Sequence, residues 1–427
     1  MPEDIYWQKY VQRFRVLPAN LDPPKQVPAM VVCIPVYGEP NLLTTLESLA
    51  QCDKPDEQVE VILLFNKSDR MTPGEVRVHD QAWQDVQEWI IHKQDGTLQY
   101  LPIYIDPPPD PRGGVGWARK LVLDEAAIRL PQDGVLLCLD SDCTVNQGYL
   151  KAVLDFFRKH PSCGAASLHF EHKLEGLEET ARTAIVQYEL HLRYLAHLNL
   201  WVGHPYAGHT VGSAMAVRRS AYLSHGGMNT RQAGEDFYFL QKFIETGVWK
   251  MIPDAVVYPS ARVSHRVPFG TGRAMTKLME TGQPWMTTDT IIFEHIIPLF
   301  QKLDQIFQCL KAGQENSSIP LFESLNLHPN VVDFLETINF LEKCREIASH
   351  TSSLDAFRKR FFRFFNAFMM IRYSHALTRQ AYPEIPVTQA AMDLAFRLNI
   401  FVDDGVDAEK LLDIYRKMDL QHAVQLR

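Results

Sequence analysis

Two aspartates, Asp140 and Asp142, end an apolar run about a third of the way along the chain. The run before them, 135–139, has the length and composition of a buried parallel strand. Residues two positions apart on an extended chain point their side chains the same way. Ionised carboxylates are expensive to desolvate, so such a pair at the end of a central strand suits a divalent cation held against a phosphorylated ligand. Capping of a helix near Asn146 is the alternative role for Asp142.

A second acidic pair, Glu235 and Asp236, follows Gly234 at the start of an expected helix. A carboxylate that faces a hydroxyl nucleophile can take up its proton as the new bond forms, so Asp236 is a candidate general base. Glu235 could orient either the nucleophile or the base. The helix dipole also favours acidic residues at a helix N-terminus, which is the alternative explanation of the pair.

Two segments that combine glycine with arginine are candidates for binding phosphate. The first, Arg112–Lys120, contains glycines that allow close backbone approach and leads into a helix start with free N–H groups. The second surrounds Gly270-Thr271-Gly272, whose glycines would let it close over a ligand. Its arginines suit a diphosphate or an anionic acceptor; they are Arg262, Arg266 and Arg273. An ordinary solvated basic loop is the alternative for the second segment. The first is a glycine-rich turn that lacks the Walker spacing of a P-loop.

The elements that must position these residues alternate between strands and helices in the first part of the chain. Apolar runs predict buried strands at 29–36, 59–65, 98–105 and 135–139. Helices are predicted between them at 41–50, 81–91 and 117–130. This alternation predicts an α/β fold with a mostly parallel sheet and helices on both faces.

The pattern becomes mixed after residue 150 and purely helical after residue 285. Helices are expected at 150–159, 181–200 and 237–246, and strands at 164–170 and 212–217. We therefore expect an N-terminal arm over 1–27, an α/β domain over 28–284 and a helical C-terminal region over 285–427. The α/β domain divides into two halves, 28–145 and 146–284, which the family resemblance given below implies are the nucleotide-binding half and the acceptor-binding half.

Bulk composition indicates an ordinary globular protein. The chain has 427 residues, of which 46% are hydrophobic and 22% charged, with a net charge of -8. That charge argues against general affinity for nucleic acid, and we expect no such partner. The seven cysteines form no CxxC pair and are typical of buried thiols in a reducing compartment. With no signal peptide and no apolar stretch of membrane-spanning length, we expect a cytoplasmic protein.

Aromatic and basic residues interleave at helical spacing in the segment Leu354–Tyr373. An interfacial helix that meets anionic lipid would have this composition. A helix that packs its aromatic side into the core or into a dimer would also have it, and we favour packing, because such helices are commoner in cores. Peripheral membrane contact and a homodimer remain open. The residues concerned are Phe357, Phe361, Phe364, Phe365 and Phe368, with Arg358, Lys359, Arg360, Arg363 and Arg372.

Three segments together resemble glycosyltransferases of the GT-A fold, most like family 2, the nucleotide-sugar-dependent inverting enzymes. The segment Cys33–Glu39 resembles the opening strand and nucleotide-binding turn, and 139–142 is similar to the DxD motif. The stretch from Gly212 to Asp236 is similar to the acceptor-site stretch with its terminal ED pair. The resemblance covers residues 28 to 275. The Gln-x-x-Arg-Trp motif of processive members is absent after residue 260, which argues against a polysaccharide synthase.

The resemblance implies an enzyme that moves a sugar from a UDP- or GDP-sugar to a hydroxyl acceptor, with Mn²⁺ or Mg²⁺ as cofactor. The acceptor would be a glycan, a lipid-linked molecule or a small molecule. Asp142 would be the first metal ligand, Asp140 would contact the metal more loosely or the ribose, and His265 would be a further ligand. Nucleotide-sugar contacts are implied for Pro35, Tyr37, Glu39, Asp69, Arg119, Asp140 and Ser141.

Other functions remain open at this point. A retaining glycosyltransferase on the same fold would use the acidic pair for positioning. A sugar nucleotidyltransferase shares the nucleotide-binding sheet but usually opens with a glycine-rich, arginine-containing loop, which 35–40 does not resemble. A catalytically inactive glycan-binding protein is the third alternative, and the presence of Asp140, Asp142 and Asp236 argues against it.

Overall fold

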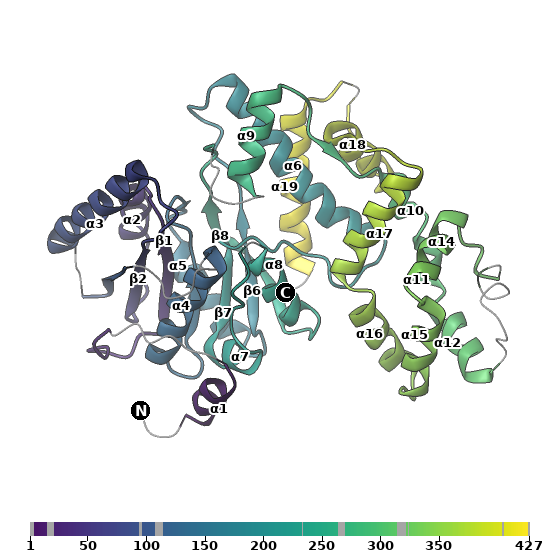
Figure 1. Cartoon of the computed structure of the whole chain (residues 1–427), viewed down its shortest axis with the longest axis horizontal. Coiled ribbons are helices and arrows are strands. Elements are labelled where there is room, and N and C mark those ends of the chain that lie inside the picture. The colour runs from purple at the N-terminus through teal and green to yellow at the C-terminus, as the bar shows by residue number, and fades with distance from the viewer. Residues whose placement is uncertain are drawn as a thin grey trace. The chain divides into compact units, whose positions relative to one another are not determined.

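The computed structural model describes residues 4–14, 21–93, 96–106, 114–232, 234–263, 270–313, 322, 324–403 and 405–425. The chain divides into two compact units (Figure 1). The first unit comprises Met1–Ala181, Thr210–Thr276 and Met418–Arg427. The second comprises Arg182–His209 and Lys277–Lys417.

An eight-stranded sheet with the order β3-β2-β1-β4-β7-β6-β8-β5 forms the centre of the first unit (Figure 1). Its strands are β1 (Met30–Val36), β2 (Val59–Asn66), β3 (Leu98–Ile105), β4 (Val135–Cys138), β5 (Thr144–Val145), β6 (Ala165–Phe170), β7 (Met215–Arg218) and β8 (Trp249–Tyr258). Every residue of β2 is buried. Strands enclosed in this way read as continuous apolar runs, which is why the sequence predicts them well.

The directions of the strands decide at which edge of the sheet the candidate site residues lie. Strand β1 is parallel to β2 and β4, whereas β7 is antiparallel to both β4 and β6. Strand β8 is parallel to β6, so β1, β4, β6 and β8 all end at the same edge of the sheet, and β7 begins there. We call this the site edge.

The helices of this part of the chain connect the strands and cover the sheet. They are α1 (Ile5–Arg13), α2 (Leu42–Ala50), α3 (Pro73–Lys93), α4 (Val115–Arg129), α5 (Tyr149–Lys159), α7 (Arg219–Ser224), α8 (Glu235–Ile244) and α9 (Thr271–Thr281). Helix α4 packs on β1 and β2. The predicted fold class, a mostly parallel sheet with helices and a helical C-terminal region, is confirmed.

Several elements differ from the sequence prediction. Strand β8 was not predicted, because Pro253 and Asp254 interrupt its apolar run, and the pairing register with β6 shifts between Leu168 and His169. Helix α3 begins at Pro73, well before the predicted residue 81. Helix α1 was not predicted within the N-terminal arm.

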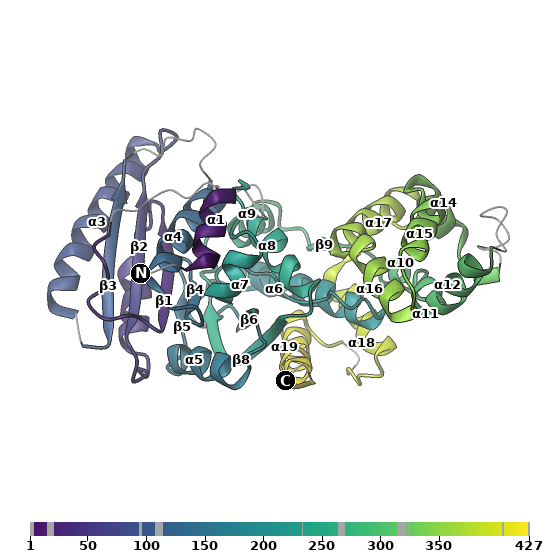
Figure 2. The ribbon, with the colours of Figure 1, turned by 90° about the horizontal axis from the view of Figure 1, so that it is seen from below.

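Helix α1 packs against α7 (Figure 2). Its Tyr10 side chain is 1% exposed, donates to Asp124 Oδ1 over 2.7 Å and accepts from Lys120 Nζ over 2.7 Å. The ring lies against Gly227, whose φ of +64° suits glycine and whose missing side chain makes room for Tyr10. The N-terminal helix thereby contacts both α4 and the turn that follows α7.

The second unit is helical apart from two short paired strands, β9 (Met286–Thr287) and β10 (Ile385–Pro386). Its other elements are most of α6 (Glu179–Trp201), α10 (Thr290–Glu294), α11 (Ile297–Gln301), α12 (Leu303–Ala312), α14 (Pro329–Thr337), α15 (Phe340–Ser349), α16 (Leu354–Phe364), α17 (Ala367–Gln380), α18 (Val387–Arg397) and most of α19 (Ala408–Gln425). Phe361 and Phe365 are buried in its core. Among the described helices, none combines the length and apolar character that crossing a bilayer requires.

Candidate active site

Loops at the site edge bring together residues that lie far apart in sequence. Glu39 follows β1, Asp140 and Asp142 follow β4, and Arg262 follows β8. Because these strands are parallel to one another, their carboxyl ends meet at one edge. Gly212 reaches the same edge from the opposite direction, because it precedes the antiparallel strand β7.

The Arg119 guanidinium on α4 is the centre of this group. Its side chain is 3% exposed, and Nη2 donates to Asp140 Oδ1 over 2.9 Å. Nη1 donates to the Gly212 carbonyl over 2.8 Å, and Nε lies 3.3 Å from Glu235 Oε1. A side chain at Gly212 would place its first carbon 2.8 Å from Nη1, so the guanidinium would have to shift from its present position. A buried cation is thus held between carboxylates from two different elements.

The acidic pair begins helix α8, directly after Gly234 with its φ of +69°. Burial raises the pKa of Glu235 to about 7, although the Arg119 charge opposes the shift. Burial also raises the pKa of Asp236, again against the effect of Arg119. Raised pKa values bring both groups closer to the range in which a carboxylate can exchange protons at neutral pH.

The two carboxylates differ in access. The Glu235 side chain is 4% exposed and forms an ion pair with Arg119, whereas Asp236 is only partly buried. Glu235 is therefore placed to hold Arg119, which leaves Asp236 as the candidate to meet a ligand.

A second ion-pair group joins the ends of β1, β4 and β8. Arg262 donates to both carboxylate oxygens of Glu39, with 2.9 Å from Nη1 to Oε1. Its Nη2 lies 3.3 Å from Asp142 Oδ2. Glu39 is fully buried and also accepts from the Asn41 backbone N–H over 3.1 Å. Sequence reasoning assigned Glu39 to the nucleotide and Arg262 to phosphate or acceptor, and the structure brings these two residues into direct contact.

The donor set of Asp140 and Asp142 fits a hard divalent cation. Both are oxygen ligands, and their side chains are 38% and 28% exposed. Magnesium is commonly held by one or two carboxylates together with substrate phosphates and water, which matches this pair. No group of three or more His, Cys, Asp and Glu side chains forms a metal site within the described ranges. The described side chains would therefore supply part of a coordination shell.

The remaining predicted residues occupy varied positions. Pro35 and Tyr37 are partly exposed at the end of β1 and beyond it, and Ser141 is buried, with its carbonyl accepting from Thr45 Oγ1 over 2.9 Å. Asp69 and Arg273 are exposed. The predicted residues His265 and Arg266 lie outside the described residues, as does Arg112.

Some residues of the site were not found by sequence reasoning. The Gly212 carbonyl on Arg119 is one, and His79, whose Nδ1 accepts from the Gly38 backbone N–H over 3.2 Å, is another. A backbone carbonyl has no sequence signal. His79 is part of α3, whose first turns were not predicted.

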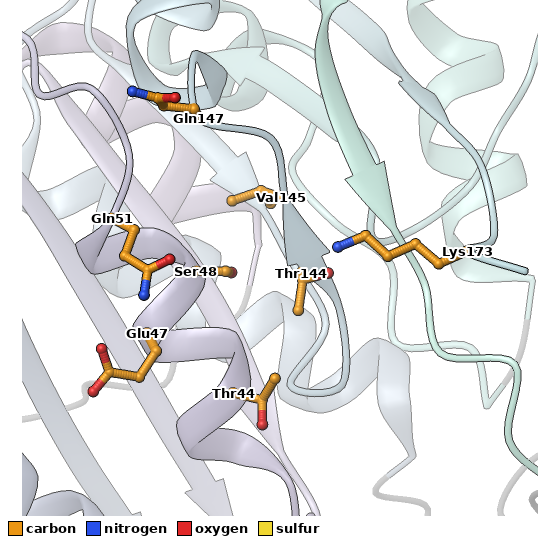
Figure 3. Close-up of a pocket in the computed structure, with 8 residues that line it drawn as sticks. All are labelled: Thr44, Glu47, Ser48, Gln51, Thr144, Val145, Gln147 and Lys173. Carbon is orange, nitrogen blue, oxygen red and sulfur yellow. The ribbon is translucent and has the colours of Figure 1, made fainter. Parts of the chain in front are cut away.

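A cavity of about 350 Å³ lies between α2 and β5 (Figure 3). The Lys173 side chain extends towards Thr144 in Figure 3, and its Nζ lies 4.4 Å from the centre of the Tyr258 ring. None of the predicted site residues lines this cavity. The lining residues are Thr44, Glu47, Ser48, Gln51, Thr144, Val145, Gln147 and Lys173.

Comparison with known families decides the enzyme class. Residues 31–225 match the family described as glycosyl transferase family 2. This part of the chain is a family 2 glycosyltransferase domain. The predicted resemblance and the predicted enzyme class, a glycosyltransferase, are confirmed by the match, which contains Glu39, Arg119, Asp140 and Asp142. The ED pair at 235–236 lies beyond the matched residues. No curated protein matches the chain.

Solved structures give only distant likenesses to this chain. TarS of S. aureus is 19% identical with a TM-score of 0.36, and the alignment covers 54% of this chain and 36% of TarS. This chain therefore spans about a third of that protein. A TarS 1–349 complex with UDP-GlcNAc is 15% identical with a TM-score of 0.38, covering 93% of this chain and 92% of that one. The mannosyltransferase PcManGT from Pyrobaculum calidifontis, in complex with GDP-Man and Mn²⁺, is 14% identical with a TM-score of 0.34, covering 98% and 94%.

Proposed function

We propose that this glycosyltransferase moves one sugar from a nucleoside-diphosphate sugar to a hydroxyl acceptor with inversion, using Asp236 as general base. One observation carries the proposal. The half-buried Asp236 has a raised pKa. The positive charge of the buried Arg119 interacts with both Asp236 and Asp140. The proposed base, Asp236, and a carboxylate proposed to face the phosphates, Asp140, are therefore close to the same positive charge.

The chemistry assigns a role to each group. The acceptor hydroxyl gives its proton to Asp236 while its oxygen bonds to the anomeric carbon, and the bond to the diphosphate oxygen breaks. Asp142, with Asp140, would hold Mn²⁺ or Mg²⁺, which when bound neutralises charge on the leaving diphosphate. Arg119 keeps Asp140 and Glu235 in place, and Glu39 orients Arg262 beside Asp142.

Nucleotide titration tests the donor side. UDP and GDP are each titrated into the whole chain by calorimetry, with and without Mn²⁺. We expect one of them to bind in a metal-dependent way, and we expect Asp142→Ala to abolish that dependence. The matched control is Asp133→Ala, which removes an exposed carboxylate at the opposite end of β4. Absence of binding by both nucleotides under every metal condition would refute the donor proposal.

The stereochemistry tests the mechanism separately. Once a donor and an acceptor are known, proton NMR of the first product gives the anomeric configuration. Inversion agrees with a single displacement assisted by Asp236. Retention would refute the base assignment and leave the acidic pair with a positioning role.

A further inference from the structure

The helix α16 has two chemically distinct sides. Phe357 and Phe361 are buried in the core of the second unit, and Phe365 is buried just after the helix ends. The opposite side is solvent-exposed and basic, and its residues are Arg358, Lys359, Arg360 and Arg363. The aromatic packing favoured from the sequence therefore occupies one side of this helix, and the cations are left on the other.

These four cations have no acidic partner among the residues that the structure describes. Two partly exposed cations of the second unit do have one: Lys343 pairs with Glu346 at 2.6 Å and Arg397 with Glu294 at 2.6 Å. The exposed Asp355 is the acidic residue within α16 itself. In a chain of net charge -8, four adjacent unpaired cations form a local field of the opposite sign.

Helix α17 continues this character after a short junction at Phe365 and Asn366. One exposed stripe at helical spacing begins with two apolar residues, Phe368 and Ile371, which are 44% and 41% exposed. The same stripe continues with the exposed Arg372 and Arg379. Exposed aromatic and aliphatic side chains beside cations are the composition of helices that lie in a membrane interface.

We propose that the basic side of α16, which carries Arg358, Lys359, Arg360 and Arg363, docks the protein on an anionic phospholipid bilayer, together with the exposed α17 residues Phe368, Ile371 and Arg372 that follow it in the chain. Charge complementarity supplies the attraction, because each cation near an anionic leaflet strengthens binding about fivefold. The two apolar side chains distinguish a bilayer from a nucleic acid or a soluble polyanion, because they gain free energy only by entering an apolar phase. Docking requires no sugar transfer, so this proposal is independent of the proposed function.

Vesicle sedimentation tests the proposal with the whole chain. The vesicles contain phosphatidylcholine alone or phosphatidylcholine with phosphatidylglycerol. We expect binding to the anionic vesicles only, and weaker binding as salt rises, because exposed charges are screened. A variant with Arg358, Lys359, Arg360 and Arg363 all changed to Gln should lose more than about a hundredfold in partition coefficient.

A matched variant controls for total charge. Lys25, Lys54, Lys151 and Lys159 are exposed lysines of the first unit, and changing all four to Gln removes the same charge from elsewhere. We expect this variant to bind as the wild type does. If the α16 variant fails to fold by circular dichroism, the double variant Arg360→Gln with Arg363→Gln replaces it, with an expected loss of more than about tenfold.

Three results would overturn the proposal. One is equal binding to neutral and anionic vesicles, and another is undiminished binding by the folded α16 variant. The third is binding to a polyphosphate chain with none to vesicles, which would assign the surface to a soluble polyanion instead.

Discussion

Two buried arginines, one in each unit, form ion pairs with carboxylates in two different arrangements. In the second unit, Arg193 is fully buried and contacts Glu189 over 2.8 Å, and Glu189 also accepts from Arg416. In the first unit, Arg119 is surrounded by Asp140, Glu235 and Asp236. The helical unit thus places one carboxylate between two cations, and the sheet unit places one cation among three carboxylates.

The sign of the charge that is in excess in each group explains the difference in chemistry: positive around Glu189 and negative around Arg119. A carboxylate between two guanidinium groups has its charge fully compensated. Three carboxylates around one cation cannot all be compensated, and burial then raises the pKa of both Glu235 and Asp236. Asp140 and Asp236 also remain partly exposed at the site edge, whereas Glu189 is closed off from solvent. A buried ion pair by itself is therefore weak evidence for a site, and an excess of partly exposed carboxylates is stronger evidence.

The largest expected effect is on catalysis. Asp236→Asn should lower kcat about 10²–10⁴-fold, because the amide cannot accept the acceptor proton. The free energy of unfolding should change little, since the fold already disfavours the charged form of this side chain. Steady-state kinetics and urea unfolding measure the two quantities. Full activity in this variant would contradict the assignment of Asp236 as base, and with it the functional contrast between the group around Arg119 and the group around Glu189.

The corresponding change in the second cluster should act on stability. Glu189→Ala leaves two buried or mostly buried guanidinium groups without this partner and should cost about 3–5 kcal/mol in the free energy of unfolding. Glu409→Ala is the control, because its pair with Arg182 is more than a third exposed and should contribute less than about 1 kcal/mol. Urea unfolding compares the variants. A loss of similar size in both would contradict the contrast drawn from burial.

The pH dependence of stability should sharpen the contrast. The pKa of Glu235 is raised from 4.5 to about 7, so the folded protein keeps a proton that the unfolded chain has released. That stabilisation is complete below pH 4.5 and is lost as pH rises through about 7, a decline of up to about 3 kcal/mol. Glu235→Gln has no titratable carboxyl group at this position, so its free energy of unfolding should fall less between pH 4.5 and about 7. Urea unfolding at several pH values measures the slope, and Glu409→Gln should keep that of the wild type.

The smallest expected effect concerns a third buried carboxylate, Asp124, on the same helix as Arg119. It accepts from Tyr10 and Tyr222, each over 2.7 Å, and pairs with Lys120. Tyr10→Phe removes one donor and should cost about 1–2 kcal/mol without changing kcat. Tyr6→Phe is the control, because Tyr6 is 43% exposed. A fall in kcat with unchanged stability would instead link helix α1 to catalysis.

Much of the first unit could be predicted because its buried parallel strands are continuous apolar runs. Strand β3 was predicted at its observed bounds, 98–105, and β1 within one residue. Strand β8 escaped because Pro253 and Asp254 break its pattern, and helix α1 escaped because its packing depends on Gly226 and Gly227, more than two hundred residues away in sequence. The carboxylates of the site were found from their position after a strand or at a helix start.

The sequence alone determined which carboxylates and arginines are candidates for the site and at which edge of the sheet they lie. The edge follows because strands that alternate with helices are parallel and end on the same side. The resemblance to family 2 around residues 33–39 and 139–142 could be recognised in the same way. Only the tertiary structure decided which charges meet. The contact of Arg262 with Glu39, and of Arg119 with Asp140, Glu235 and the Gly212 carbonyl, joins segments that are far apart in the chain. Their energies depend on distance and burial, which spacing along a sequence does not contain.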